Sequence, residues 1–197
     1  MILGMMAIDG RFKLWKQCLT ALTNLADQTL VLIHDHGEID VNATAVAAQN
    51  CGADYTLAKQ YHWNRWNWRE FMLGQADWLK PELILCPDQD EQFGTGFWDD
   101  IRRFRESDKL GLMFGYHAPL PTVDGVDPCI GAPWPTYPGL PHMKAFKWRA
   151  SLTYKNYTGF ARVTNYADPK YHLQARSEMM HYCAWDEEMR KGKDWKW

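Results

Sequence analysis

Three carboxylates lie within four residues of the chain, in the segment Asp88-Gln89-Asp90-Glu91. The segment follows a short apolar run, 83–86, that has the composition of a buried strand. Because side chains alternate along extended backbone, we expect Asp88 and Asp90 to point to one side and Gln89 to the other. Carboxylates are the hard oxygen ligands that Mg²⁺ and Mn²⁺ prefer. The segment therefore predicts a divalent metal site with Asp88 and Asp90 as ligands.

Three other interpretations, two of the acidic segment 88–91 and one of the histidines beside Asp35, agree less well with the sequence. An EF-hand calcium loop beginning at Asp88 would need Gly at its sixth position, which is Phe93. A helix-capping role is disfavoured because the next predicted helix begins too far downstream, near Phe97. A separate zinc site at His34-Asp35-His36 is also disfavoured, because no further ligands lie nearby in the sequence.

Strands and helices are expected to alternate before the acidic segment. Apolar or β-branched runs predict strands, and apolar residues at helical spacing predict helices. The predicted strands are Ile2–Ile8, Thr29–Asp35, Asp54–Ala58 and Leu83–Cys86, with helices at Arg11–Ala26, Val41–Cys51 and Trp66–Leu79 between them. This α/β pattern predicts an open, mostly parallel sheet with helices on both faces.

Three acidic residues fall at the predicted carboxyl ends of strands: Asp9, Asp35 and Asp88. Ligands of open α/β sheets bind at this rim, so we expect the three to converge on a nucleotide pocket. Neither a GxGxxG fingerprint nor a Walker P-loop occurs in the chain. A dinucleotide or P-loop site is therefore not supported.

The second half of the chain departs from this alternation. Seven of the ten prolines fall between Pro119 and Pro141, which predicts a long loop serving as a lid or an acceptor wall. Around that loop we expect a helix at 97–106, a strand at 110–116, a strand or hairpin at 144–157, a short helix or strand pair at 171–183 and a polar helix at 185–193. We expect one domain, 1–197, with a nucleotide-binding half at 1–110 and an acceptor half at 111–197.

The charge distribution and the cysteine content indicate which binding partners and which cellular compartment to expect. The net charge of -2 gives no overall attraction to nucleic acid or membrane, but residues 142–176 hold seven Lys or Arg against one acid. That segment predicts either a solvated basic surface or one that faces phosphates, and its interleaved aromatic residues suit nucleic acid. Five scattered cysteines without a CxxC pair fit a reducing compartment. With no apolar run of spanning length, we expect a soluble cytoplasmic protein.

The sequence resembles the family 2-like glycosyltransferases of the GT-A fold. The resemblance rests on the acidic segment 88–91 after an apolar strand, on Trp68-Arg69-Glu70 at a helix start, and on His181-Tyr182, and it covers residues 1 to about 110 in order and spacing. It implies that Asp88 and Asp90 hold Mn²⁺ or Mg²⁺ on the donor's diphosphate and that His181 completes the metal shell, with His172 as the rival histidine.

The resemblance also implies contacts to the donor nucleotide. Asp35 corresponds to the acid that contacts the nucleoside, and Arg69 to a basic residue that contacts the base or a phosphate. The Asn-Glu pair usual after the first strand is replaced here by Ile8-Asp9-Gly10-Arg11, so the resemblance does not supply a nucleoside contact at this strand end, and Asp9 is expected to contact the nucleotide only from its position at the rim. The expected donor is a nucleotide-diphosphate sugar, with UDP-sugars first.

An inverting transferase needs a base that deprotonates the acceptor hydroxyl. Glu91 and Asp127 are the favoured candidates, with Asp124 and His117 behind them. The acceptor is expected to be a glycan, a small molecule or, through the basic segment, a modified DNA base flipped from the stack. Two other functions stay open: a metal-dependent nucleotidyltransferase or phosphohydrolase, and a catalytically silent module that binds nucleotide sugars.

Overall fold

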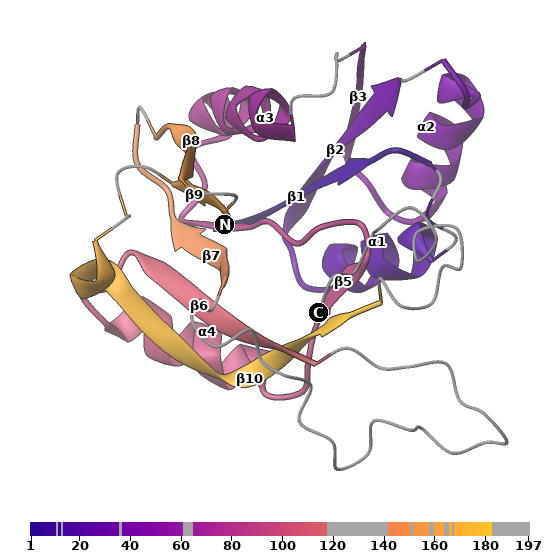
Figure 1. Cartoon of the computed structure of the whole chain (residues 1–197). Helices are drawn as coiled ribbons and strands as arrows, with labels where there is room; N and C mark the ends of the chain where they lie inside the picture. Colours follow the sequence, from indigo (N-terminus) through magenta and orange to yellow (C-terminus); the bar gives the residue numbers. More distant parts are fainter. Residues whose placement is uncertain are drawn as a thin grey trace, which may run out of the picture.

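The computed structural model describes residues 1–10, 12, 14–35, 37–60, 65–117, 142–150, 152–157, 160–163, 166 and 168–182 (Figure 1). Its strands are β1 (Ile2–Ile8), β2 (Gln28–Asp35), β3 (Tyr55–Gln60), β4 (Leu83–Leu85), β5 (Glu91–Phe93), β6 (Gly111–His117), β7 (His142–Lys147), β8 (Tyr154–Tyr157), β9 (Phe160–Val163) and β10 (His172–His181). Its helices are α1 (Trp15–Thr23), α2 (Val41–Asn50), α3 (Arg65–Leu79) and α4 (Phe97–Glu106), with a 3₁₀ turn at Pro169–Tyr171.

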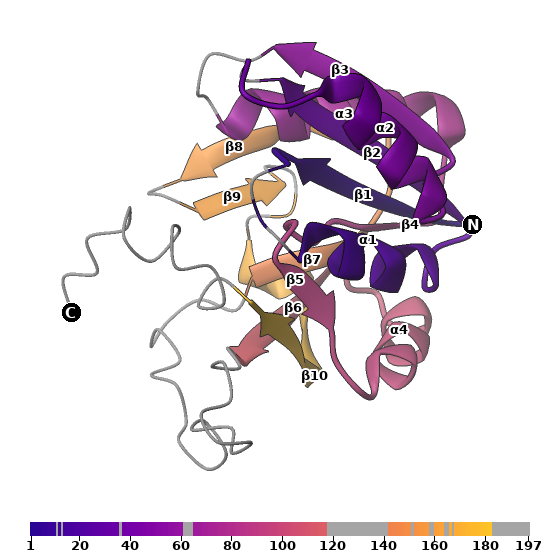
Figure 2. The same cartoon turned by 90° about the vertical axis from the view of Figure 1, so that its right-hand side faces the viewer.

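Eight strands form one curled sheet in the order β3-β2-β1-β4-β7-β6-β10-β5 (Figures 1 and 2). The strands β3, β2, β1 and β4 are parallel. Beyond β4 the sheet is mixed, because β7 runs antiparallel to both β4 and β6, and β5 runs antiparallel to β10. The prediction of a mostly parallel sheet is therefore wrong for this part. Apolar runs identify strands but do not specify their direction, and β7 and β5 each pair with a strand that is far away in the sequence, β4 and β10 respectively.

Helices cover both faces of the sheet, as predicted. Alternation along β2 directs Val31 and Ile33 into the core under α1, α2 and α4, and Leu30 and Leu32 into the core under α3. Each of these four side chains is at most 2% exposed. The strands β1, β2 and β4 are thus buried on both faces, which is why they appear in the sequence as continuous apolar runs.

The predicted elements of the first half are present with small shifts at their ends. In the second half, the segment 144–157 contains parts of β7 and β8, and 171–183 contains one long strand, β10, in place of the expected short helix or strand pair. The three-residue strand β5 was not predicted. The proline-rich segment and the helix expected at 185–193 lie outside the described residues.

The strand β10 brings the end of the described chain back to the acidic segment. It pairs with β5 in a register that sets Met180 opposite Gln92 and His181 opposite Glu91. Figure 2 shows β5 and β10 side by side. Among the helices of the described residues, none combines the length and the apolar character needed to cross a membrane.

Candidate functional site

The acidic loop, residues 88–91, is a turn and not the extended segment that was predicted. β4 ends at Leu85 and β5 begins at Glu91. The amide of Glu91 donates to the carbonyl oxygen of Asp88 at 3.1 Å, and the Glu91 carboxylate accepts from the amide of Asp88 at 2.7 Å. A turn brings its first and fourth residues together. The turn therefore places the Glu91 carboxylate beside the backbone of Asp88.

A buried lysine binds these two carboxylates. The Nζ atom of Lys144 lies 2.8 Å from Oδ2 of Asp88 and 2.8 Å from Oε2 of Glu91. The side chains of Lys144 and Glu91 are 5% and 2% exposed, whereas that of Asp88 is 36% exposed. Asp88 thus has one carboxylate oxygen on the lysine while its side chain still reaches the surface.

Sequence reasoning missed Lys144 as part of the site and counted it in the basic segment. The sequence did contain a sign of this role. Lys144 interrupts an apolar run, Met143-Lys144-Ala145-Phe146, which lies within the central strand β7. A lysine inside a buried strand is expected to have an acidic partner. The sequence alone did not show which acid that was.

Tyr116, on β6, lies beside the same ion pairs. Burial of its phenol raises its pKa well above the ordinary value, and the negative charge of Glu91 raises it further. The Lys144 Nζ lies 6.0 Å from the Tyr116 ring centroid, and His142 packs edge-on against that ring with the centroids 4.7 Å apart. The Tyr116 hydroxyl therefore keeps its proton and serves as a hydrogen-bond donor.

The acidic loop is tied to the end of β1 by two hydrogen bonds. The amide of Asp9 donates to Oε1 of Gln89 at 3.0 Å, and Nε2 of Gln89 donates to Oδ1 of Asp9 at 2.8 Å. Asp35 ends the neighbouring strand β2, where its Oδ1 accepts from the amide of Gly37 at 2.9 Å. Because β2, β1 and β4 are adjacent and parallel, Asp9, Asp35 and Asp88 lie at one rim of the sheet, as predicted.

Asp90, the second predicted metal ligand, is only 7% exposed. Its carbonyl oxygen accepts from the amide of Tyr182 at 2.7 Å, which fixes the loop to the end of β10. Its charge acts on Cys18 of α1: burial raises the pKa of that thiol to about 12, and the negative charge of Asp90 contributes to the rise. Cys18 is thus a protonated core residue behind the loop.

The two candidate histidines lie at opposite ends of β10. The backbone of His181 is directly opposite Glu91, although about ninety residues separate them in sequence. His172 is nine residues away, a distance of roughly 30 Å along a strand, and its Nε2 lies 2.7 Å from the carbonyl oxygen of Tyr166. His181 is therefore the histidine that the fold brings to the acidic loop.

Several other predicted residues are placed only in part. Arg69 belongs to α3 and His117 ends β6, but nothing is described of their side chains or of the His181 side chain. Asp124 and Asp127 lie in the segment 118–141, outside the described residues.

The acidic loop offers carboxylate oxygens to a divalent ion but not a complete set of ligands within the described residues. Its donors are carboxylate oxygens, the type that Mg²⁺ and Mn²⁺ take, and Asp88 reaches the surface. Within the described residues, no group of three His, Cys, Asp or Glu side chains converges as a ready-made metal site. Mg²⁺ is commonly held by one or two carboxylates together with substrate phosphates. The arrangement suits an ion that binds together with a diphosphate.

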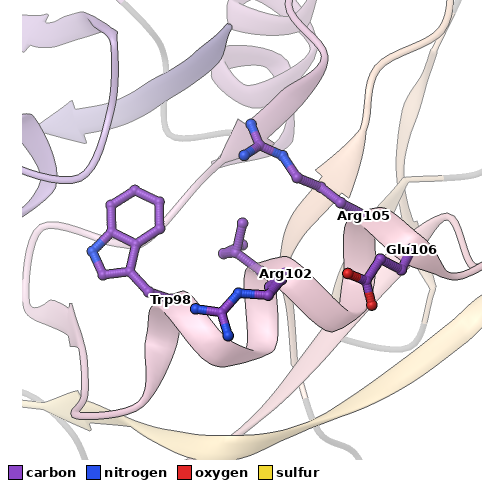
Figure 3. A pocket seen from close by; sticks show the side chains of 5 residues that line it. Trp98, Arg102, Arg105 and Glu106 are labelled. Atoms are coloured by element: carbon purple, nitrogen blue, oxygen red, sulfur yellow. The ribbon is translucent and has the colours of Figure 1, made fainter.

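A separate hollow of about 420 Å³ lies on the outer face of α4, lined by Trp98, Ile101, Arg102, Arg105 and Glu106 (Figure 3). Both of its arginines already have acidic partners. Arg105 binds Glu82 through two hydrogen bonds of 3.0 Å, and Arg102 lies 3.4 Å from Asp99. We assign no function to this hollow.

Comparison with known proteins supports the fold. No family model matches the chain, and no curated protein matches it in sequence. Two structures of S. aureus TarS resemble it: TarS 1–349 with a TM-score of 0.53 and 13% identity, and a longer TarS structure with 0.56 and 12%. Each match covers 92% of this chain, which spans 60% and 36% of the two TarS chains. A 4-diphosphocytidyl-2C-methyl-D-erythritol synthase from Anaerococcus prevotii follows at a TM-score of 0.44, too low to support an argument. The protein therefore has a mixed α/β fold similar to that of TarS.

Proposed function

We propose that the protein is a metal-dependent glycosyltransferase that moves a sugar from a nucleotide-diphosphate sugar to an acceptor hydroxyl, with inversion. The observation that carries this proposal is the acidic loop, which ends β4 at the rim of a glycosyltransferase-like sheet and is hydrogen-bonded to Asp9 at the end of β1. A rim of this kind is where open α/β sheets bind nucleotides. The expected donors are UDP-sugars.

Asp88, with Asp90 and His181, would hold Mn²⁺ or Mg²⁺. When bound, such an ion neutralises the charge that develops on the leaving diphosphate. An ion arriving from solvent can reach Asp88, since its side chain is 36% exposed. Asp9 and Asp35 would contact the nucleoside from the neighbouring strand ends, and Arg69 the base or a phosphate.

The acceptor side needs a base, for which Glu91 and Asp127 remain the candidates. Glu91 is 2% exposed, and its carboxylate contacts the Lys144 ammonium and the amide of Asp88. It would have to leave Lys144 before taking a proton from an acceptor. The acceptor itself is expected to be a glycan, a small molecule or a modified DNA base.

A product screen tests the proposal. Nucleotide sugars with a panel of acceptors and, in parallel, nucleoside triphosphates with sugar 1-phosphates are incubated with the protein and Mn²⁺, and released nucleoside diphosphate and pyrophosphate are measured separately. We expect nucleoside diphosphate, with the rate falling about 10²–10³-fold in Asp88→Asn because a stabiliser of the leaving group is lost. The matched control is Asp99→Asn, whose side chain is 76% exposed on α4.

Two results would refute glycosyl transfer. Release of pyrophosphate would indicate a nucleotidyltransferase on the same scaffold. Binding of nucleotide sugars without release of nucleoside diphosphate with any acceptor would indicate a silent binding module.

A further inference from the structure

Lys144 is a charged side chain in a position where charged side chains are rare. It lies on β7, between β4 and β6 in the interior of the sheet, and its side chain is 5% exposed. Its carbonyl oxygen accepts from the amide of Cys86 at 2.8 Å, so the lysine backbone is fixed directly beside the start of the acidic loop. A lysine is almost never buried to this extent without acidic partners.

The ammonium of Lys144 holds two carboxylates that would otherwise repel each other. Each carboxylate has an oxygen 2.8 Å from the same nitrogen, one from Asp88 and one from Glu91. Repulsion between charges so close is strong where water is largely excluded. Without the ammonium, the turn at 88–91 would lose the interaction that opposes this repulsion.

The three charged groups differ in their exposure to solvent, and only one of them reaches the surface. Lys144 and Glu91 are buried, whereas Asp88 is 36% exposed and lies at the rim. The Glu91 carboxylate also accepts from the amide of Asp88, which fixes the backbone at the residue that reaches solvent. The buried pair is thus placed to set the position of Asp88.

We propose that Lys144 is a positioning residue for Asp88, and that its ammonium takes the place of a resident cation inside the acidic loop. The loop is then held in shape before any ligand arrives, and Asp88 is presented to a divalent ion that comes with a diphosphate. This inference rests on the proposed function for its last step only. In the absence of nucleotide, the protein should have little affinity for a divalent ion.

Removal of the ammonium tests the proposal without measuring activity. Lys144→Gln is titrated with Mn²⁺ alone, without nucleotide, and followed by thermal unfolding and by the electron paramagnetic resonance signal of free Mn²⁺. We expect the Tm to fall by roughly 10 °C, because breaking a buried ion pair is strongly destabilising. Mn²⁺ should restore part of this loss and bind about tenfold or more tighter than to the unaltered protein, because two carboxylates lose their cation.

Two control variants separate this role from a general need for lysine on β7. Lys147→Gln removes a lysine whose Nζ donates to the carbonyl oxygen of Ser107 at 2.7 Å, so Mn²⁺ should not restore its stability. Lys144→Arg keeps the positive charge and should respond to Mn²⁺ as the unaltered protein does.

The proposal is overturned if Lys144→Gln and the unaltered protein bind Mn²⁺ equally, or if Mn²⁺ restores Lys147→Gln as well. If Lys144→Gln is too unstable to purify, Lys144→Gln/Glu91→Gln removes one carboxylate charge together with the ammonium. It should fold and bind Mn²⁺ no more tightly than the unaltered protein; failure to fold would count against repulsion as the cause. A protein that passes these tests but never binds a nucleotide sugar would refute the proposed function and leave the role of Lys144 standing.

Discussion

At the scale of single residues, the turn at 88–91 decides which carboxylates act together. Spacing along an extended strand would pair Asp88 with Asp90, but the chain reverses at Gln89 and Asp90 and brings Glu91 onto the amide of Asp88. A three-residue separation is the natural spacing of partners across a turn. Glu91 is therefore an internal partner of Asp88 in this arrangement, and its predicted role as a catalytic base stays a prediction.

Gln89 provides the residue-scale test of how the loop is attached to the sheet. We expect Gln89→Ala to lower the free energy of unfolding by about 1–3 kcal/mol, because two hydrogen bonds to Asp9 are lost at a partly buried site. Urea unfolding followed by tryptophan fluorescence measures this change.

The matched control is Gln49→Ala, which removes an exposed glutamine side chain from α2 and should stay within about 0.5 kcal/mol of the unaltered protein. Equal stability of both variants would mean that the Gln89–Asp9 contact does not hold the loop.

At the scale of elements, β10 reaches the acidic loop after an irregularity in its pairing with β6. Its register with β6 shifts between Gln174 and Glu178, which leaves the intervening amides without partners in that ladder. The carboxylate of Asp100 on α4 accepts from the amides of Arg176 and Ser177 at 2.7–3.0 Å. A helix side chain thus supplies the acceptors that the neighbouring strand does not.

A close backbone approach fixes the same region. The amide of Gly94 donates to the carbonyl oxygen of Glu178 at 2.9 Å, and a Cβ atom at position 94 would collide with that oxygen. Only glycine therefore fits where the chain leaves β5 beneath β10.

Asp100 gives the element-scale prediction, which concerns pH. Burial alone would raise its pKa, but hydrogen bonds from the Ser177 hydroxyl and from the amides of Arg176 and Ser177, with the charge of Arg103, lower it below the ordinary 3.8. A lowered folded-state pKa adds stability above the ordinary value, and this stability is lost as the pH falls below about 4. Asp100→Asn should be destabilised by about 3–5 kcal/mol at neutral pH, and its stability should fall less steeply than that of the unaltered protein between about pH 5 and 2.5.

Thermal unfolding of both proteins across this pH range measures the effect, with Asp99→Asn as the neighbouring exposed control. Parallel Tm curves for Asp100→Asn and the unaltered protein would show that Asp100 does not carry this pH dependence.

At the scale of the whole molecule, the sequence predicts the parallel half well and the remainder poorly. The strands β1, β2 and β4 are buried on both faces and are separated by amphipathic helices, so local patterns identify them. The strand β5 has three residues, and its partner β10 lies about ninety residues further along. Local patterns carry no information about such pairing, and for that reason the mixed part of the sheet was missed.

The basic segment shows the same limit for the site. Lys144 was counted with residues that form a solvated or phosphate-facing surface, but it is buried on Asp88 and Glu91. Lys170 also has an acidic partner, with its Nζ 2.9 Å from Asp168. Asp168 is the one acid already counted in this segment, so it is the burial of Lys144 that reduces the support for a DNA acceptor. The rim formed by Asp9, Asp35 and Asp88 could be predicted, because it depends only on strand ends.

Binding of a nucleoside diphosphate tests the central claim most directly. UDP is titrated calorimetrically into the unaltered protein, Asp88→Asn and Asp99→Asn, each with and without Mn²⁺. We expect Mn²⁺-dependent binding to the unaltered protein and to Asp99→Asn, weakened on the order of tenfold or more in Asp88→Asn because a metal ligand is lost. Binding of equal strength to Asp88→Asn, or no binding to the unaltered protein in the presence of Mn²⁺, would contradict it.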